Sequence, residues 1–290
     1  MDAFRADPRT GAVRLLPATL TAIAFALLFW QPFTLLLRDW WTLPEAGHGL
    51  LLAPVAVWLA WKAGIRRDAS PNQLVGAVML ILAVALRYMS GLAAELFTMR
   101  ASMVFALGGL TVYYYGIRQL IHWWMPFLLG TLSIPLPELI TQALALPLQF
   151  KASQMGAALL DMREIPVRLT GNVIRIPGNE LFVTEACSGL RSLTALLSLS
   201  VLLGGLVLQK PVLRLLLVLL AIPIAVVING IRVFMTGFLV YFVDPALGKG
   251  FMHITEGWLL FLVSLTCMGA VAWLGSITEQ YFFREPAINA

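Results

Sequence analysis

Residues 213–233 read LRLLLVLLAIPIAVVINGIRV, a run in which Arg214, Asn229 and Arg232 are the conspicuous polar interruptions. About 20 apolar residues are needed for a helix to cross the hydrocarbon core of a membrane, so this run predicts a transmembrane helix. Seven further runs fit the same prediction: Leu15–Leu37, Gly49–Ala63, Leu74–Ser90, Ala101–Tyr115, a proline-broken run at His122–Pro137, Leu190–Leu208 and Gly257–Ile277. The sequence therefore predicts an all-α polytopic membrane protein with about eight transmembrane helices.

Composition supports this fold class. The chain has 290 residues, of which 60% are hydrophobic and 12% are charged, and its mean hydropathy is +0.85. A soluble globular protein has about a quarter of its residues charged, so a soluble fold is excluded. The net charge of +5 does not point to nucleic acid, because Lys and Arg in a polytopic protein mainly mark cytoplasmic loops. We expect membrane lipids as partners and no nucleic acid.

Two segments differ from the apolar runs. Leu139–Leu160 is moderately apolar and predicts an amphipathic helix at the interface or a re-entrant piece. Ile165–Cys187 alternates apolar and polar residues and contains Thr-Gly-Asn and Pro-Gly-Asn turns, so it predicts a small β-ribbon. With no repeat or low-complexity linker, residues 1–290 are interpreted as one domain without an extra soluble C-terminal domain.

The positive-inside rule orients these segments. Eight spans with both termini in the cytoplasm place the β-ribbon outside. On that topology Cys187 opens the sixth span, Arg232 closes the seventh and His253 precedes the eighth, all on the outer face. The basic residues that share the inner side are Arg5, Arg9, Arg14, Lys62, Arg66, Arg67, Arg118, Lys210, Arg214 and Arg284.

Cys, Arg and His side chains are a sufficient set for acyl transfer. A cysteine nucleophile needs a partner that raises its thiolate fraction, and a donor that holds the oxyanion as it forms. His253 can move the proton, and Arg232 can stabilise the thiolate or the oxyanion. Cys187 also lies near a predicted helix N-terminus, which favours a thiolate. Asn229 lies three residues before Arg232 on the same helical face, which indicates a polar site.

Each residue also has a structural interpretation. A cysteine at a span boundary packs as a small hydrophobic residue in most proteins, and a terminal Arg anchors a span by snorkelling. Weaker candidates for the same site are Ser188, in the entry turn, and His48, which faces outside. Glu185 and Arg191 flank the cysteine and could equally pair with each other. No spacing of histidines and cysteines fits a metal site, and no phosphate-binding loop or dinucleotide motif is present, so no cofactor is expected.

These motifs together resemble the exosortase/archaeosortase family. The residues that carry the resemblance are Glu185-Ala186-Cys187-Ser188-Gly189-Leu190-Arg191-Ser192, Asn229-Gly230-Ile231-Arg232-Val233, and His253 followed by Gly257-Trp258. Gly47-His48-Gly49 is similar to the family's N-terminal Ser-His-Gly-Phe element, with Gly47 in place of the usual small polar residue. The resemblance covers roughly residues 38–276.

The resemblance implies a membrane protein-sorting enzyme, a cysteine protease or transpeptidase of the bacterial inner membrane with its active site facing the periplasm. Cys187, Arg232 and His253 match the family's proposed catalytic triad. The implied substrates are membrane-anchored proteins with a C-terminal signal made of a short motif such as Pro-Glu-Pro, a transmembrane helix and a basic tail. The acceptor of the acyl group is not implied. The family is also tied to exopolysaccharide gene neighbourhoods.

Two other functions stay open at this stage. A non-enzymatic transporter or scaffold for exopolysaccharide export would leave Cys187 merely packed, and Cys187→Ala would then be silent. A serine intramembrane protease using Ser188 or Ser192 is disfavoured because the sequence lacks Gly-x-Ser-Gly.

Overall fold

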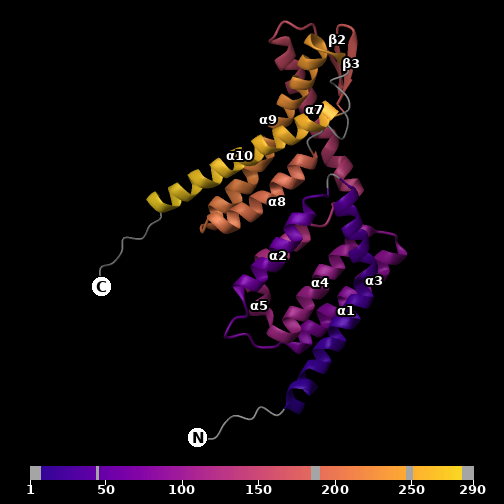
Figure 1. The fold of residues 1–290 in the computed structure, drawn as a ribbon, viewed down its shortest axis with the longest axis vertical. Helices are drawn as coiled ribbons and strands as arrows, with labels where there is room; N and C mark the ends of the chain where they lie inside the picture. Colours follow the sequence, from indigo (N-terminus) through magenta and orange to yellow (C-terminus); the bar gives the residue numbers. More distant parts are fainter. Residues whose placement is uncertain (1–7, 44–45, 184–189, 246–250, 283–290) are drawn as a thin grey trace. The chain divides into compact units, whose positions relative to one another are not determined.

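The computed structural model describes residues 8–43, 46–183, 190–245 and 251–282, and it places side chains for residues 19–43, 46–183, 193–245 and 259–281. It is mostly helical, with one small antiparallel sheet (Figure 1). Two compact units make up the chain. Unit 1 comprises residues 1–42 and 65–121, and unit 2 comprises residues 43–64 and 122–290. The prediction of one domain stays a prediction.

The helices follow the predicted apolar runs closely at most positions. Their bounds are α1 Pro8–Thr42, α2 Gly49–Ala63, α3 Gln73–Leu92, α4 Leu96–Tyr115, α5 Ile117–His122, α6 Trp124–Leu132, α7 Glu138–Asp161, α8 Leu190–Val207, α9 Pro211–Phe242 and α10 Phe251–Phe282. The amphipathic segment expected at 139–160 is the continuous helix α7.

Five helices in the described part of the chain are long and apolar enough to cross a membrane: Thr19–Thr42, Gln73–Leu92, Leu96–Tyr115, Pro211–Phe242 and Leu259–Tyr281. Gly49–Ala63 and Leu193–Val207 are apolar but shorter. The structure therefore supports a multi-pass membrane protein, whereas the predicted count of eight spans is not confirmed.

The span predicted at His122–Pro137 is wrong. Helix α6 covers only the nine residues Trp124–Leu132. At a rise of 1.5 Å per residue its length is about 14 Å, which is less than half the thickness of the hydrocarbon core. Ser133 ends it, and Pro135 and Pro137 follow. Proline removes a backbone donor and disfavours helical dihedrals in the preceding residue, so the apolar run cannot continue as one helix.

Unit 1 consists of α1 and the α3–α4 pair, with the short α5 after α4. Side-chain caps begin both paired helices: Asn72 Oδ1 accepts from Val75 N at 3.2 Å, and the Glu95 carboxylate accepts from Phe97 N and Thr98 N at 2.9 and 2.6 Å. Helix α1 joins α4 through an ion pair of 2.6 Å between Asp39 and the buried Arg100.

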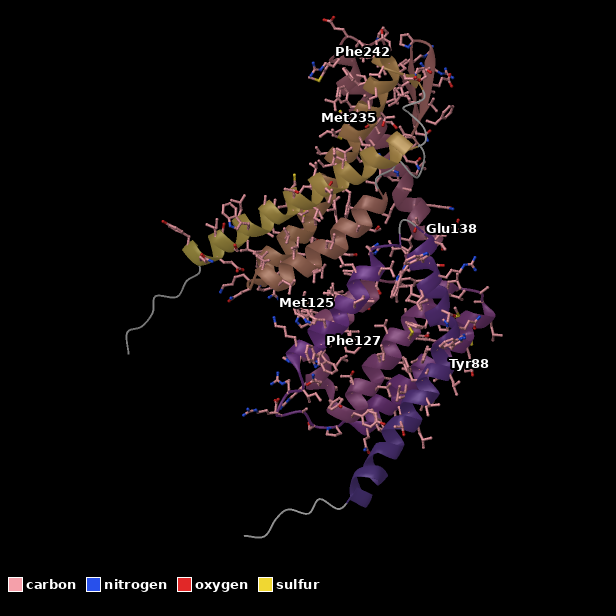
Figure 2. All side chains as sticks on the ribbon, in the orientation of Figure 1. Tyr88, Met125, Phe127, Glu138, Met235 and Phe242 are labelled. Atoms are coloured by element: carbon pink, nitrogen blue, oxygen red, sulfur yellow. The ribbon has the colours of Figure 1, made fainter. Side chains whose placement is uncertain are left out.

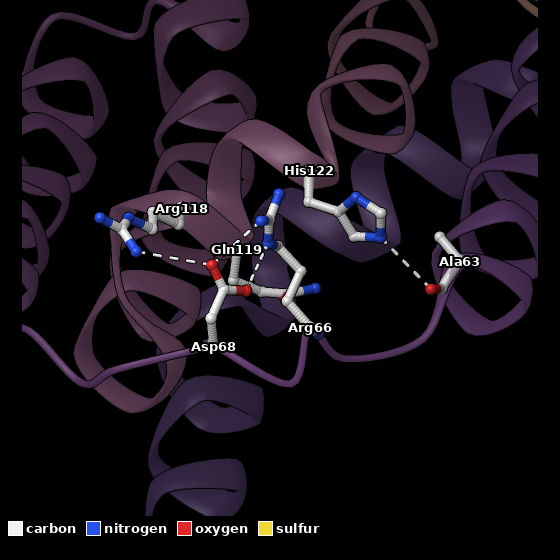
Figure 3. Close-up of polar contacts among 6 residues, drawn as sticks. All are labelled: Ala63, Arg66, Asp68, Arg118, Gln119 and His122. Atoms are coloured by element: carbon white, nitrogen blue, oxygen red, sulfur yellow. Dashed lines mark hydrogen bonds and ion pairs between the residues drawn. The ribbon is translucent and has the colours of Figure 1, made fainter.

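The loop between α2 and α3 is fastened to the α4–α5 junction within unit 1 (Figure 3). Arg66 donates two hydrogen bonds to Asp68, at 2.8 and 3.0 Å, and Arg118 approaches the same carboxylate at 3.5 Å. The backbone N–H of Arg66 donates to the buried Oε1 of Gln119 at 2.9 Å. The hydrogen bond from Arg66 lowers the pKa of Asp68 to about 2.

Gly116 ends α4 at the same junction, and we predict that Gly116→Ala destabilises the protein. Its φ of 85° disfavours any residue with a side chain, and a Cβ there would collide with the carbonyl oxygen of Ser70. Strain alone costs about 1–2 kcal/mol, and the collision adds to it. Thermal unfolding of the purified protein in detergent measures the loss.

Gly178→Ala is the matched control for that experiment. Its φ is 79°, but no atom lies within 4 Å of a Cβ at this position. We expect Gly178→Ala to lower the unfolding midpoint less than Gly116→Ala does. Equal decreases of the unfolding midpoint in the two variants would show that the collision with Ser70 contributes nothing to the destabilisation.

Unit 2 has a helical core formed by α7, α8, α9 and α10. The buried residues that share this core are Ala145, Leu193, Leu196, Leu208, Leu217, Ala221, Ala225, Met268 and Ala272. Helices α2 and α6 pack beside α8 through Leu52, Ala56, Met125, Leu129 and Leu202. His122 Nε2 donates to Ala63 O at 3.3 Å and secures the end of α2 (Figure 3).

The predicted β-ribbon is a three-stranded antiparallel sheet of β1 Arg168–Thr170, β2 Val173–Ile176 and β3 Asn179–Phe182, in the order β1-β2-β3. Gly171, with φ 63°, opens the first two-residue turn, as type II′ hairpin turns require. Pro177 and Gly178, with φ 79°, form the second. The segment 184–187, also predicted in the ribbon, lies outside the described residues.

Candidate functional site

All eight candidate residues from the sequence lie in the chain segments of unit 2, and none lies in unit 1. Glu185, Cys187 and Ser188 lie outside the described residues. Arg191 and His253 lie in the first turns of α8 and α10, where only the helix is described. The structure describes the side chains of the remaining three: His48, Asn229 and Arg232.

Helix α9 carries Asn229 and Arg232, with Asn229 buried and Arg232 half-buried. The predicted seventh span ends at Val233, whereas helix α9 continues to Phe242. The continuation contains no proline, and Val233, Gly237 and Val240 are buried along it. Met235 and Phe242, labelled on this part of α9 in Figure 2, are exposed. Arg232 therefore lies within a continuous helix and not at its end.

Arg232 lies about one hydrocarbon thickness along α9 from the start of the helix. It lies 21 residues after Pro211, so at 1.5 Å per residue it is about 32 Å from the start of the helix, close to the 30 Å of the hydrocarbon core. The remaining ten residues, 233–242, extend the helix beyond that thickness. An upright α9 whose first turn lies at one boundary thus places Arg232 at the other.

Helices α7 and α9 approach each other closely around Asn229 and Arg232. A Cβ at Gly156 of α7 would lie 2.9 Å from Cβ of Val233, and closer still to its Cγ1. A Cβ at Gly230 would lie 2.8 Å from Cβ of Met155, and one at Gly237 would lie 2.8 Å from Cδ1 of Leu160. Small residues let helix backbones approach in membranes, so these glycines fix the position of the polar residues relative to α7.

The sheet shares a buried core with these two helices. Ile174 and Ile176 of β2 and Val183, just after β3, pack in one cluster with Val233 and Val240 of α9 and with Ala152, Ala157 and Leu160 of α7. Val183 lies four residues before Cys187, and Val233 follows Arg232. One hydrophobic core therefore holds the chain on the N-terminal side of the Cys187 motif and the helix that carries Arg232.

His253 was predicted to precede the eighth span at Gly257. Helix α10 begins earlier, at Phe251, so His253 lies in its first turn. At the other end of α10, Glu279 accepts hydrogen bonds from Gln209 N, at 2.9 and 3.0 Å, and from Lys210 N, at 2.6 Å. The carboxylate caps α9 and complements its dipole. Arg232 lies 22 residues after Lys210 on α9, and His253 lies 26 residues before Glu279 on α10. These separations correspond to about 33 and 39 Å along the two helices.

His48 precedes α2, and its Nε2 donates to the carbonyl oxygen of Leu132 at 3.2 Å. This contact ties α2 to the end of α6, which gives His48 a structural function. Its predicted place in the same cavity as Cys187 stays a prediction. Among the residues that the structure describes, no group of three or more His, Cys, Asp or Glu side chains could hold a metal ion.

Comparison with known proteins gives one match. The family model of transmembrane exosortases (Exosortase_EpsH) matches residues 40–270. The chain belongs to this family. Exosortases are a family of transmembrane cysteine transpeptidases that act on substrate proteins with C-terminal signals. No curated protein and no solved structure matches the chain.

The polar contacts of Asn172 in this exosortase were missed by the sequence analysis. Asn172, in the turn between β1 and β2, contacts Val183 through its backbone and its side chain, and also contacts Gln149 of α7. The sequence Thr-Gly-Asn indicated the turn. The contacts with Val183 and with Gln149 join residues 11 and 23 positions apart, and no local pattern predicts them.

The close approach of α7 and α9 generates a prediction. Gly156→Ala adds a methyl group against Val233, and overpacking of this kind costs about 1–3 kcal/mol. We expect a lower unfolding midpoint together with a loss of activity, because α9 must shift near Arg232. Thermal unfolding and substrate processing, measured on the same preparation, test both effects.

Gly269→Ala in α10 is the control, because no atom lies within 4 Å of a Cβ at that position. Alanine is a better helix former than glycine by about 1 kcal/mol. We expect this variant to be as stable as the unmodified protein or more so. A Gly156→Ala variant that behaves like Gly269→Ala would contradict the close packing.

Proposed function

We propose that this exosortase is a membrane-embedded cysteine protease and transpeptidase that cleaves the C-terminal sorting signal, of the PEP-CTERM type, from exported proteins. The cleavage takes place at the outer face of the bacterial inner membrane. The observation that carries the proposal is the buried core shared by Val183 and Val233, because these residues flank the two motifs that supply Cys187 and Arg232. Family membership supports the reaction class.

The proposed reaction has two steps. The Cys187 thiolate attacks the carbonyl carbon of the scissile amide, Arg232 stabilises the tetrahedral oxyanion, and His253 gives a proton to the leaving amine as the C–N bond breaks. The thioester then passes its acyl group to an acceptor amine or to water, which releases the thiol. Asn229, Ser188, Glu185 and Arg191 support this site, with no metal or cofactor in the scheme.

A membrane-anchored substrate is consistent with the position of Arg232, one hydrocarbon thickness along α9 from Pro211. The signal helix of the substrate would lie in the membrane beside the bundle and present its scissile bond at the boundary. The sheet can take up the extended recognition motif by strand addition, since β1 is an edge strand in the described part of the chain. Deletion of the sheet that spares cleavage would contradict this last step.

We predict that Cys187→Ala and Cys187→Ser both abolish processing of a co-expressed substrate that carries a C-terminal signal. The serine hydroxyl stays protonated where a thiol ionises, so it does not replace the nucleophile. The measurement is substrate size on a gel, with insertion of each variant checked by membrane fractionation. Cys267→Ala is the control and should process normally, because Cys267 lies within α10 as a free thiol.

Normal processing by Cys187→Ala would contradict the proposal. It would favour either Ser188 or Ser192 as the nucleophile, or the non-enzymatic transporter or scaffold for exopolysaccharide export. Arg232→Lys provides a second test, because Lys keeps the charge but lacks the planar set of donors. We expect its kcat to fall while its KM changes little.

A further inference from the structure

Asn172 holds the chain just before the Cys187 motif through two hydrogen bonds. The backbone N–H of Val183 donates to Asn172 O at 3.0 Å, and Asn172 Nδ2 donates to Val183 O at 3.0 Å. Val173 and Phe182 are the last pair of the β2–β3 ladder, so Asn172 and Val183 stand one position beyond it. The side-chain amide of Asn172 thus donates to Val183 O in place of the backbone N–H that a continued ladder would provide.

The burial of Val183 makes this donor important. Val183 is 3% exposed, and leaving a buried carbonyl oxygen without a hydrogen bond costs about 1–3 kcal/mol. Asn172 therefore stabilises the orientation of the Val183 peptide, the last peptide that the structure describes before the Cys187 motif.

A third contact connects the turn to the helices. Asn172 Nδ2 lies 3.4 Å from Oε1 of Gln149, a buried side chain on α7. Gln149 is seven residues before Gly156, the position where α7 meets Val233 of α9. Packed and hydrogen-bonded groups thus connect Val233, the neighbour of Arg232, through α7 and Asn172 to Val183, the last described residue before Cys187.

We propose that Asn172 is a positioning residue that aims the Cys187 segment at Arg232 and His253, an inference that rests on the proposed function. It touches neither substrate nor thiol in this scheme. It acts by fixing the peptide of Val183 relative to α7. The charged groups that would set the thiolate fraction of Cys187 are Arg232 of α9, His253 of α10, and Arg191 and Glu185 on its own segment.

The test uses the full-length protein with Cys267→Ala, so that Cys187 is the only thiol. The alkylation rate with iodoacetamide is measured against pH, and processing kinetics are measured in parallel. We expect the parent to show a midpoint well below the ordinary thiol value of about 8.5. Asn172→Ala should move the midpoint up toward that value and lower kcat at nearly unchanged KM.

Asn179→Ala is the matched control, because Asn179 lies in the same sheet and its side chain has no hydrogen bond within the described structure. It should keep the parent midpoint. An inserted Asn172→Ala protein with the parent midpoint and kcat would overturn the positioning role while leaving the proposed function intact. A parent midpoint near 8.5 would instead contradict the activated thiol, and with it both proposals.

Gln149→Ala is a second variant that tests the inference even if Asn172→Ala does not fold. It removes the contact of 3.4 Å but leaves both bonds to Val183. We expect a smaller shift of the midpoint in the same direction. If Asn172→Ala fails to insert and Gln149→Ala shows no shift, the inference is wrong.

Discussion

The close approach of α7 and α9 determines the arrangement of unit 2. In a membrane the lipid tails are as apolar as the side chains, so helices associate through packing, and small residues at the contact decide how near two backbones come. Gly156 on one helix, and Gly230 and Gly237 on the other, provide this contact. The same segment of α9 carries Asn229 and Arg232, so the packing that holds the helix also fixes its polar residues. The sheet then packs on both helices through Ile174 and Val183.

The sequence predicts the membrane helices well where an apolar run meets a clear end. Asn72 begins α3 as a cap, and the expected bounds of α8 agree with the structure within one residue. The failures have physical causes. The run 122–137 is apolar enough, but two prolines stop it. The predicted seventh span stops at Val233 because about 20 apolar residues are enough to cross the hydrocarbon core. Helix α9 instead continues through the apolar residues 234–242, where Val240 packs in the core shared with the sheet.

The candidate site was predicted only in part. Motif spacing identified the helix of Arg232 and the helix of His253, and both lie in unit 2 with the Cys187 segment. The structural contact of His48 with Leu132 and the contacts of Asn172 with Val183 were not predictable. Both depend on tertiary placement of carbonyl groups, which leaves no local pattern in the sequence. The ion pair between Arg175 and Glu180 on the sheet is exposed and contributes little to stability.

The central claim is that Cys187 lies next to Arg232 and His253 in the folded protein. It is tested most directly by cross-linking in a Cys267→Ala background, with a second cysteine placed by Arg232→Cys, by His253→Cys or, as the control, by Arg214→Cys. A short bis-maleimide is added to the membrane-embedded protein, and joined peptides are found by mass spectrometry. The account predicts efficient links from Cys187 to positions 232 and 253, and none to position 214 at the opposite end of α9. Linkage to position 214, or to neither 232 nor 253, would contradict it.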